Sequence, residues 1–163
     1  MRMHIRAMVC LLAVLALPAC DDDIGPDDER FLSTMNGANE LPNAIATSAT
    51  GTAEFRVQDD GTIRYTVDVN GITGVTMAHI HGPADATRNS GIMIWLYPPG
   101  ATAPATPSGA LDGRLAEGTI TPAQIPVGLD SLLVLMRTGN VYVNVHTAVN
   151  PAGEIRGQVR PRG

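Results

Sequence analysis

Two histidines stand one residue apart in the apolar segment from Met77 to Tyr97. Residues two apart in a strand point to the same face, so His79 and His81 present their imidazoles side by side, with Cα atoms about 7 Å apart. Such a pair can chelate copper, zinc, iron or nickel. Near the C-terminus, His146 alternates with valines in a second strand-like segment and joins the pair if the two strands are neighbours. The spacing therefore predicts a three-histidine metal site.

The proposed group uses every histidine that we expect in the mature chain. The sequence holds four histidines, and His4 lies in an N-terminal segment that we expect to be removed. Met77 shares the strand face of the pair and is a candidate additional ligand, since a thioether favours copper(I). Asp85 and Glu154 are the nearest carboxylates in sequence and form a weaker alternative. We expect one bound ion, with copper favoured.

A structural role for the same histidines is the main alternative. His79 and His81 can hydrogen-bond loop carbonyls around Gly82–Pro83, and His146 can cap the turn at Asn150. The protein is then a non-catalytic module whose loops bind a protein or a glycan. The sequence has no nucleophile elbow and no phosphate-binding loop, which leaves dismutase-like or copper-redox chemistry as a third, minority hypothesis.

The elements that must position these histidines are strands. Apolar and polar residues alternate with period two between Gly, Asn, Asp and Pro, which predicts an all-β, antiparallel sandwich. Asn70–Gly71 is expected to end the second strand, and the segment 92–97, apolar on both faces, is expected to be a central strand. The predicted strands are 53–57, 63–69, 75–81, 92–97, 109–120, 140–147 and 154–160.

Two short helices are also predicted. Thr121–Gln124 has a cap residue, a proline at the first helical position and a capping-box glutamine. The segment 129–138 has an apolar spacing that suits a helix, with Asp130 as its N-cap and Gly139 as its stop, although so short an apolar run also fits a strand.

The N-terminal residues 1–19 have the pattern of a secretory signal, with two arginines before an apolar stretch. Ala19 is followed directly by Cys20, as in the lipobox of bacterial lipoproteins, and we expect Cys20 to carry the lipid. Residues 20–30 are acidic and form a solvated tether, which leaves residues 31–163 as one domain. The expected location is the cell envelope, lipid-anchored to a membrane and facing the periplasm or the exterior. Asp21 hints at the inner membrane.

Charge and cysteine content argue against a nucleic-acid-binding protein and against a fold held by disulfides. The formal net charge is −5, but six of the sixteen acids lie between Asp21 and Glu29, so the region from Arg30 onward is near neutral. It has no basic stripe with interleaved aromatics, and nucleic-acid binding is not expected. With Cys10 removed and Cys20 acylated, no disulfide is expected in the mature chain.

Four motifs resemble the CHRD domain, named for chordin and also found in bacterial secreted proteins. They are AHIHGP at 78–83, YVNVHT at 142–147, P-x-G-E-I-R-G-Q at 151–158 and NELP at 39–42. The resemblance covers about residues 31–160 in order. It implies an extracytoplasmic β-sandwich and no agreed biochemical activity.

A remoter resemblance is to copper-zinc superoxide dismutase, a Greek-key β-sandwich that holds copper with a His-x-His pair and further histidines. His79 and His81 look like that pair, and His146 looks like a distant partner. The sequence lacks the bridging histidine, the zinc-ligand loop and the disulfide of that family, so a complete dismutase site is not expected. Arg156 most simply pairs with Glu154 or another strand acid, or else steers anions.

Overall fold

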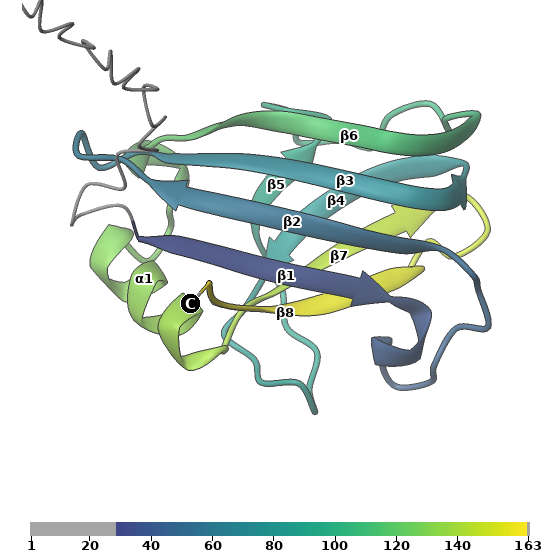
Figure 1. The fold of residues 1–163 in the computed structure, drawn as a ribbon, viewed down its shortest axis with the longest axis horizontal. Helices are drawn as coiled ribbons and strands as arrows, with labels where there is room; N and C mark the ends of the chain where they lie inside the picture. The colour runs from purple at the N-terminus through teal and green to yellow at the C-terminus, as the bar shows by residue number, and fades with distance from the viewer. Residues whose placement is uncertain (1–28, 163) are drawn as a thin grey trace, which may run out of the picture.

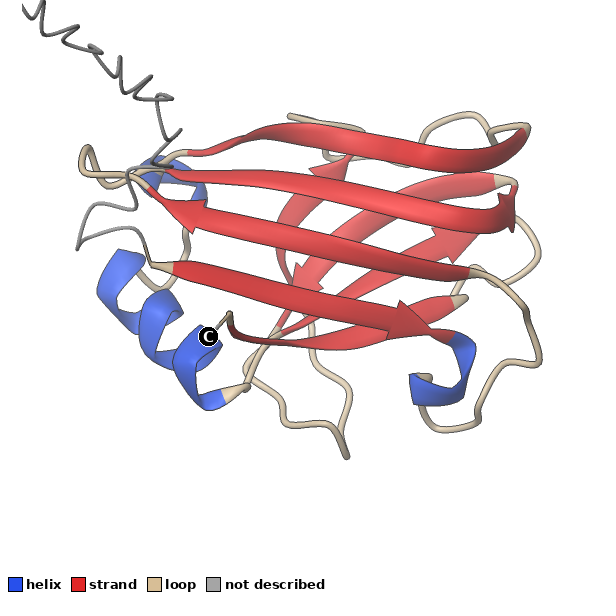
Figure 2. Ribbon diagram, in the orientation of Figure 1, coloured by secondary structure: helices blue, strands red, loops and turns tan. Residues whose placement is uncertain are grey.

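The computed structural model describes residues 29–162. The expected signal segment, the lipidation site Cys20 and the acidic tether as far as residue 28 lie outside the described residues. The described chain contains eight strands, two 3-10 turns and one helix (Figure 2). In chain order they are β1 Arg30–Asn36, η1 Gly37–Asn39, β2 Thr50–Val57, β3 Ile63–Thr73, β4 Val75–His81, β5 Ile92–Tyr97, β6 Ala110–Ile120, η2 Pro122–Gln124, α1 Leu129–Thr138, β7 Tyr142–Thr147 and β8 Ile155–Pro161.

All eight strands belong to one antiparallel sheet with the order β5-β4-β7-β8-β1-β2-β3-β6. The sheet folds over itself, so that β6, β3, β2 and β1 lie in front of β5, β4 and β7 in Figure 1. We call β5, β4, β7 and β8 the rear half and β1, β2, β3 and β6 the front half. The two end strands, β5 and β6, approach each other without pairing. The antiparallel all-β prediction is confirmed, whereas the likeness to the dismutase topology stays a prediction.

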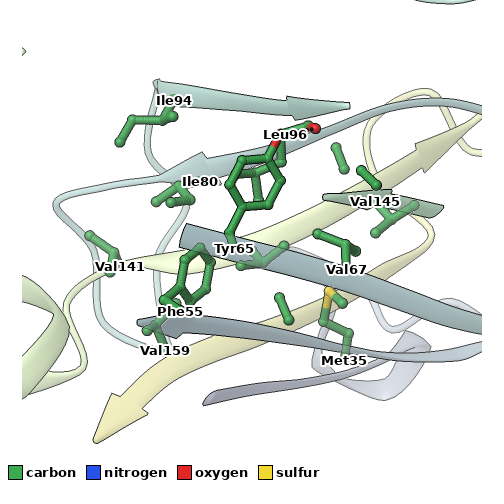
Figure 3. Packing of buried hydrophobic residues seen from close by; sticks show 14 of the residues in the cluster. Met35, Phe55, Tyr65, Val67, Ile80, Ile94, Leu96, Val141, Val145 and Val159 are labelled. Atoms are coloured by element: carbon green, nitrogen blue, oxygen red, sulfur yellow. Dashed lines mark hydrogen bonds between the residues drawn. The ribbon is translucent and has the colours of Figure 1, made fainter. Parts of the chain in front are cut away.

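The core fills the space between the two halves. Phe55, Tyr65 and Val67 point inward from the front half and meet Ile80 and other apolar residues of the rear half (Figure 3). The polar handle of the buried tyrosine is satisfied, because its hydroxyl donates to the Leu96 carbonyl at 2.8 Å. Each fully buried apolar side chain contributes roughly 1.5–3 kcal/mol, so this core holds the two halves together.

The prediction of a central strand at residues 92–97 is wrong. β5 pairs with β4 alone and ends the sheet, and Ile92 is 48% exposed. Its apolar character on both faces has another cause. Ile94 and Leu96 enter the core, whereas Trp95 on the opposite face lies edge-on to the ring of His79, at 4.2 Å between centroids.

The expected strand end at Asn70–Gly71 is also wrong. β3 continues to Thr73, with an irregularity in its pairing to β6 between Val69 and Ile72. Gly71 adopts a φ of +64°, which only glycine takes at little cost, and its N–H donates to Asp112 at 2.6 Å. The Asn70–Gly71 pair, which the sequence suggested as a turn, therefore forms a bulge within β3 and does not end the strand.

Both predicted helical segments form. Gln124 accepts the backbone N–H of Thr121 at 2.9 Å, and Gly139 ends α1 in the left-handed conformation with φ +68°. Asp130 does not cap α1, because Gly128 is the N-cap and Asp130 lies in the first turn. Within residues 29–162, no helix has the length and apolarity needed to cross a membrane.

Candidate metal centre

The three histidines lie on the outer face of the rear half, away from the core. β4 and β7 are hydrogen-bonded neighbours, with His81 opposite Tyr142 and His79 opposite Asn144. The valines that alternate with His146 on β7 enter the core, so their polar neighbours point outward. The prediction of a three-histidine group required the last hairpin to lie beside the histidine pair, and the pairing of β4 with β7 places it there.

The three imidazoles converge. One ring nitrogen from each of His79, His81 and His146 lies within 4.8 Å of the other two. The shortest approach joins His79 Nδ1 and His146 Nε2 at 3.2 Å, and the ring centroids of the three pairs are 5.0 to 5.8 Å apart. All three side chains are buried, and His79 has no exposed surface.

Backbone carbonyls fix the tautomers of two rings. His81 Nδ1 lies 3.0 Å from the Ser90 carbonyl, and His146 Nδ1 lies 3.1 Å from the Pro151 carbonyl. A carbonyl only accepts, so each Nδ1 carries the proton and each Nε2 keeps a lone pair. The Nε2 atoms of His81 and His79 are buried without a hydrogen-bond partner. The structural alternative thus accounts for the bonds of His81 and His146 to carbonyls and for the bond between His79 and His146, but it leaves the Nε2 atoms of His79 and His81 without a partner.

The environment keeps the rings neutral. Burial, followed by the nearby His146 and His81, lowers the pKa of His79 from 6.5 to about 3. Burial, followed by His81, lowers the pKa of His146 to about 4 against the opposing Pro151 carbonyl. Burial also lowers the pKa of His81, although hydrogen bonds to Ser90 and Gly91 raise it in part. Neutral imidazole is the form that binds a metal.

The donor set fits a metal ion with nitrogen ligands. Metal–nitrogen bonds of about 2.0–2.1 Å place the ligand atoms of a trigonal or tetrahedral site about 3.3–3.6 Å apart, so the ring nitrogens would have to move together by up to about 1.5 Å to bind one ion. Neither of the alternative carboxylates joins the group. Asp85 accepts from Thr87 and pairs with exposed Arg88. Met77 is half-buried on β4 opposite His146, and its role as a ligand stays a prediction.

The expected pairing of Arg156 with Glu154 is wrong. Both oxygens of Glu154 are taken by groups that hold the neighbouring loops, namely the hydroxyls of Thr47 and Thr147 and the amide of Asn150. Glu154 precedes β8 and serves the turn, whereas Arg156 lies within the strand and faces the neighbouring β7. Spacing along the chain placed the two residues on one face but did not reveal these partners.

Arg156 and Tyr142 extend the site in a way that the histidine pattern did not indicate. The guanidinium of Arg156 lies 3.5 Å above the centre of the Tyr142 ring. The other face of that tyrosine stacks on His81, with centroids 5.0 Å apart and planes within 6° of parallel. In the sequence, Arg156 stood out only as part of the motif P-x-G-E-I-R-G-Q at 151–158, and that motif did not indicate a chemical role for it.

Glu40 and Asn144 form a second buried polar pair beside the histidines. Asn144 Nδ2 donates to Glu40 Oε2 at 3.3 Å, while Glu40 Oε1 and Asn144 Oδ1 have no partner. Burial raises the pKa of Glu40 from 4.5 to about 7, although Asn144 and Arg156 lower it in part. The sequence assigned Glu40 to a family motif and gave it no role.

Replacing the buried carboxyl, Glu40→Gln, is expected to change how stability depends on pH. The native pKa of about 7 exceeds the unfolded value of 4.5, so the native state loses stability as the pH rises between these values. The amide removes this loss, which amounts to about 3 kcal/mol. Urea unfolding at pH 5 and pH 8 measures it, with the exposed Glu117→Gln as the control for loss of a charge. Identical pH dependence in wild type and Glu40→Gln contradicts the assignment.

Residues 31–159 match the model of the CHRD domain. Neither the comparison with curated proteins nor the comparison with solved structures gave a significant match. The matched region contains all three histidines, Tyr142 and Arg156.

Proposed function

The chain belongs to the CHRD domain family, and we propose that it binds a single copper ion through His79, His81 and His146. The observation that carries this proposal is the convergence of three buried, neutral imidazoles, two of which, His79 and His81, have an Nε2 atom without a hydrogen-bond partner. A buried polar atom without a partner costs free energy, about 1–3 kcal/mol. A bound ion would give His81 Nε2 a partner and would replace the hydrogen bond between His79 Nδ1 and His146 Nε2.

The chemistry of the donors favours copper over harder ions. Calcium, magnesium and manganese prefer carboxylate and carbonyl oxygens, and no carboxylate belongs to the group. Imidazole suits copper, zinc, iron and nickel, and copper(II) binds most tightly among the divalent ions. Met77, on the strand face of the pair, would add a soft thioether and favour copper further.

We also propose that the domain is held at a membrane of the cell envelope. The support is the sequence, in which an apolar leader ends at Ala19, a lipobox-like Cys20 follows, and an acidic tether leads to β1. In that arrangement the domain holds or delivers copper outside the cytoplasm. No free thiol is expected in the mature chain, and none is needed because the proposed ligands are imidazoles.

Metal analysis tests the proposed function. Protein purified without a histidine tag, loaded with copper and desalted, is expected to retain about one equivalent. Because the ion binds the folded state, the midpoint of thermal unfolding should rise, and a chelator should reverse both effects. Thermal scans and elemental analysis of the same samples provide the two readouts.

A different result selects another function. Retention of well under one equivalent, with no thermal shift at saturating copper(I) or copper(II), would contradict the metal site. The non-catalytic interaction module would then be the better hypothesis. Superoxide or oxidase turnover by loaded protein would instead add a catalytic role to the same site.

A further inference from the structure

We propose that Arg156 makes this centre selective for copper(I) over divalent ions, by fixing a buried positive charge behind Tyr142. This inference rests on the proposed function, because it concerns which ion the three histidines hold. It assigns a specificity role to a residue that contacts no ligand atom.

Arg156 is almost completely enclosed, with 1% of its surface exposed. Its guanidinium donates to Asn89 Oδ1 at 2.5 Å and to the Arg88 carbonyl at 2.7 Å, with a longer contact to the Asp85 carbonyl at 3.4 Å. All these acceptors are neutral. Among residues 29–162, no carboxylate lies within ion-pair distance of it. A buried cation without a carboxylate at ion-pair distance is costly.

The nearby acids compensate this charge only in part. Glu40 is the buried carboxyl in this cluster, and its raised pKa of about 7 leaves it only partly ionised at neutral pH. Asp85 lies at the surface, where Arg88 pairs with it at 3.1 Å. The histidines themselves are neutral. The centre therefore contains three neutral ligands, one fixed cation and no full negative charge.

The charge reaches the metal centre through one aromatic ring. Arg156 covers one face of Tyr142 and His81 covers the other, so the guanidinium lies on the order of 10 Å from the converging nitrogens. At an effective dielectric constant of about 20, each additional unit of charge on the ion then lowers its affinity by about tenfold. A divalent ion meets this repulsion twice over, whereas copper(I) meets it once.

Arg156 also has a structural role that must be separated from its charge. Its bonds to Arg88 and Asn89 hold the loop 82–91, and that loop supplies the Ser90 carbonyl that orients His81. Loss of the fork of hydrogen bonds would weaken binding of every ion to a similar degree. Loss of the charge would change the ratio between ions of different charge.

The experiment measures affinities for copper(I) and zinc(II) in wild type, Arg156→Gln and Arg156→Lys. Chelator competition gives both constants, and neither ion has a geometric preference from its d electrons. Arg156→Gln is expected to lower the ratio of copper(I) to zinc(II) affinity by about tenfold. Arg156→Lys keeps the charge and should leave the ratio within about twofold of wild type, whatever happens to each affinity. For copper alone, a tenfold change corresponds to about 59 mV in the copper(II)/copper(I) potential.

An unchanged ratio in Arg156→Gln, or equal ratios in both variants, would overturn the inference. If neither variant folds, Asn144→Asp tests the same point, because Asn144 lies opposite both His79 and Arg156 in the sheet. The new carboxylate should lower the ratio, and a ratio equal to or above that of wild type would refute the electrostatic role. If wild-type protein binds neither ion, the proposed function is wrong. If it binds an ion but the ratio of copper(I) to zinc(II) affinity does not change with the charge at residue 156, only this inference is wrong.

Discussion

His146→Ala is expected to lower copper affinity by more than about a hundredfold and so to abolish retention of the ion on a desalting column. His146 is the ligand contributed by β7, and its Nε2 approaches His79 Nδ1 at 3.2 Å. Loss of an outer-shell partner of a metal typically costs 10- to 100-fold in affinity, and loss of one of three direct ligands should cost more. The remaining pair on β4 should bind copper only weakly.

The measurement is a competition titration with a chromophoric copper chelator, together with elemental analysis of desalted protein. Tyr65→Phe is a matched control, since it also removes a buried side-chain bond to a carbonyl, here that of Leu96, but it faces the core. Its copper content should equal that of wild type. Retention of a full equivalent by His146→Ala would show that copper binds elsewhere.

In metal-free Glu40→Gln protein, the buried histidines are expected to cost on the order of 5 kcal/mol of unfolding free energy between pH 6.5 and pH 4. The native pKa values of His79 and His146, about 3 and about 4, lie below the unfolded value of 6.5. The unfolded chain therefore binds more protons in this window, and stability falls as the pH falls. Each unit of difference contributes about 1.4 kcal/mol.

Glu40 acts in the opposite direction over part of the same range, so the comparison is best made in Glu40→Gln protein. Denaturant unfolding at half-unit pH intervals gives the slope. His79→Phe, which keeps a buried ring without a titratable nitrogen, should remove about half of the effect. A flat profile between pH 6.5 and pH 4, or the same slope in His79→Phe, would contradict neutral burial of the histidines.

The sequence predicted the histidine centre because strand periodicity is local. Alternation with period two fixes which residues share a face, and it correctly placed His79 with His81 and opposed His146 to the core valines. Adjacency of β4 and β7 is not a local property, and it depended on an assumption that the sheet order then confirmed.

The remaining features depend on contacts between distant segments. Glu40 enters the site from the loop after β1, and Arg156 binds the loop after β4, so no spacing along the chain joins them to the histidines. The apolar run 92–97 was misplaced for a related reason. Hydrophobic residues on both faces show that a strand is covered on both sides, but they do not show what covers it. Here one face is covered by the imidazole of His79, against which Trp95 packs.

Because β5 and β6 do not pair, β5 is an edge strand, and this affects how fast an ion could enter or leave the site. β5 is held by hydrogen bonds on one side only, and its Trp95 shields the innermost imidazole, that of His79. Fraying of a terminal strand costs far less free energy than global unfolding, so transient release of β5 uncovers this ring while the other seven strands stay folded. Uptake and release of an ion would then be gated by opening of this strand, which lets a nearly enclosed centre exchange its ion without a permanent opening.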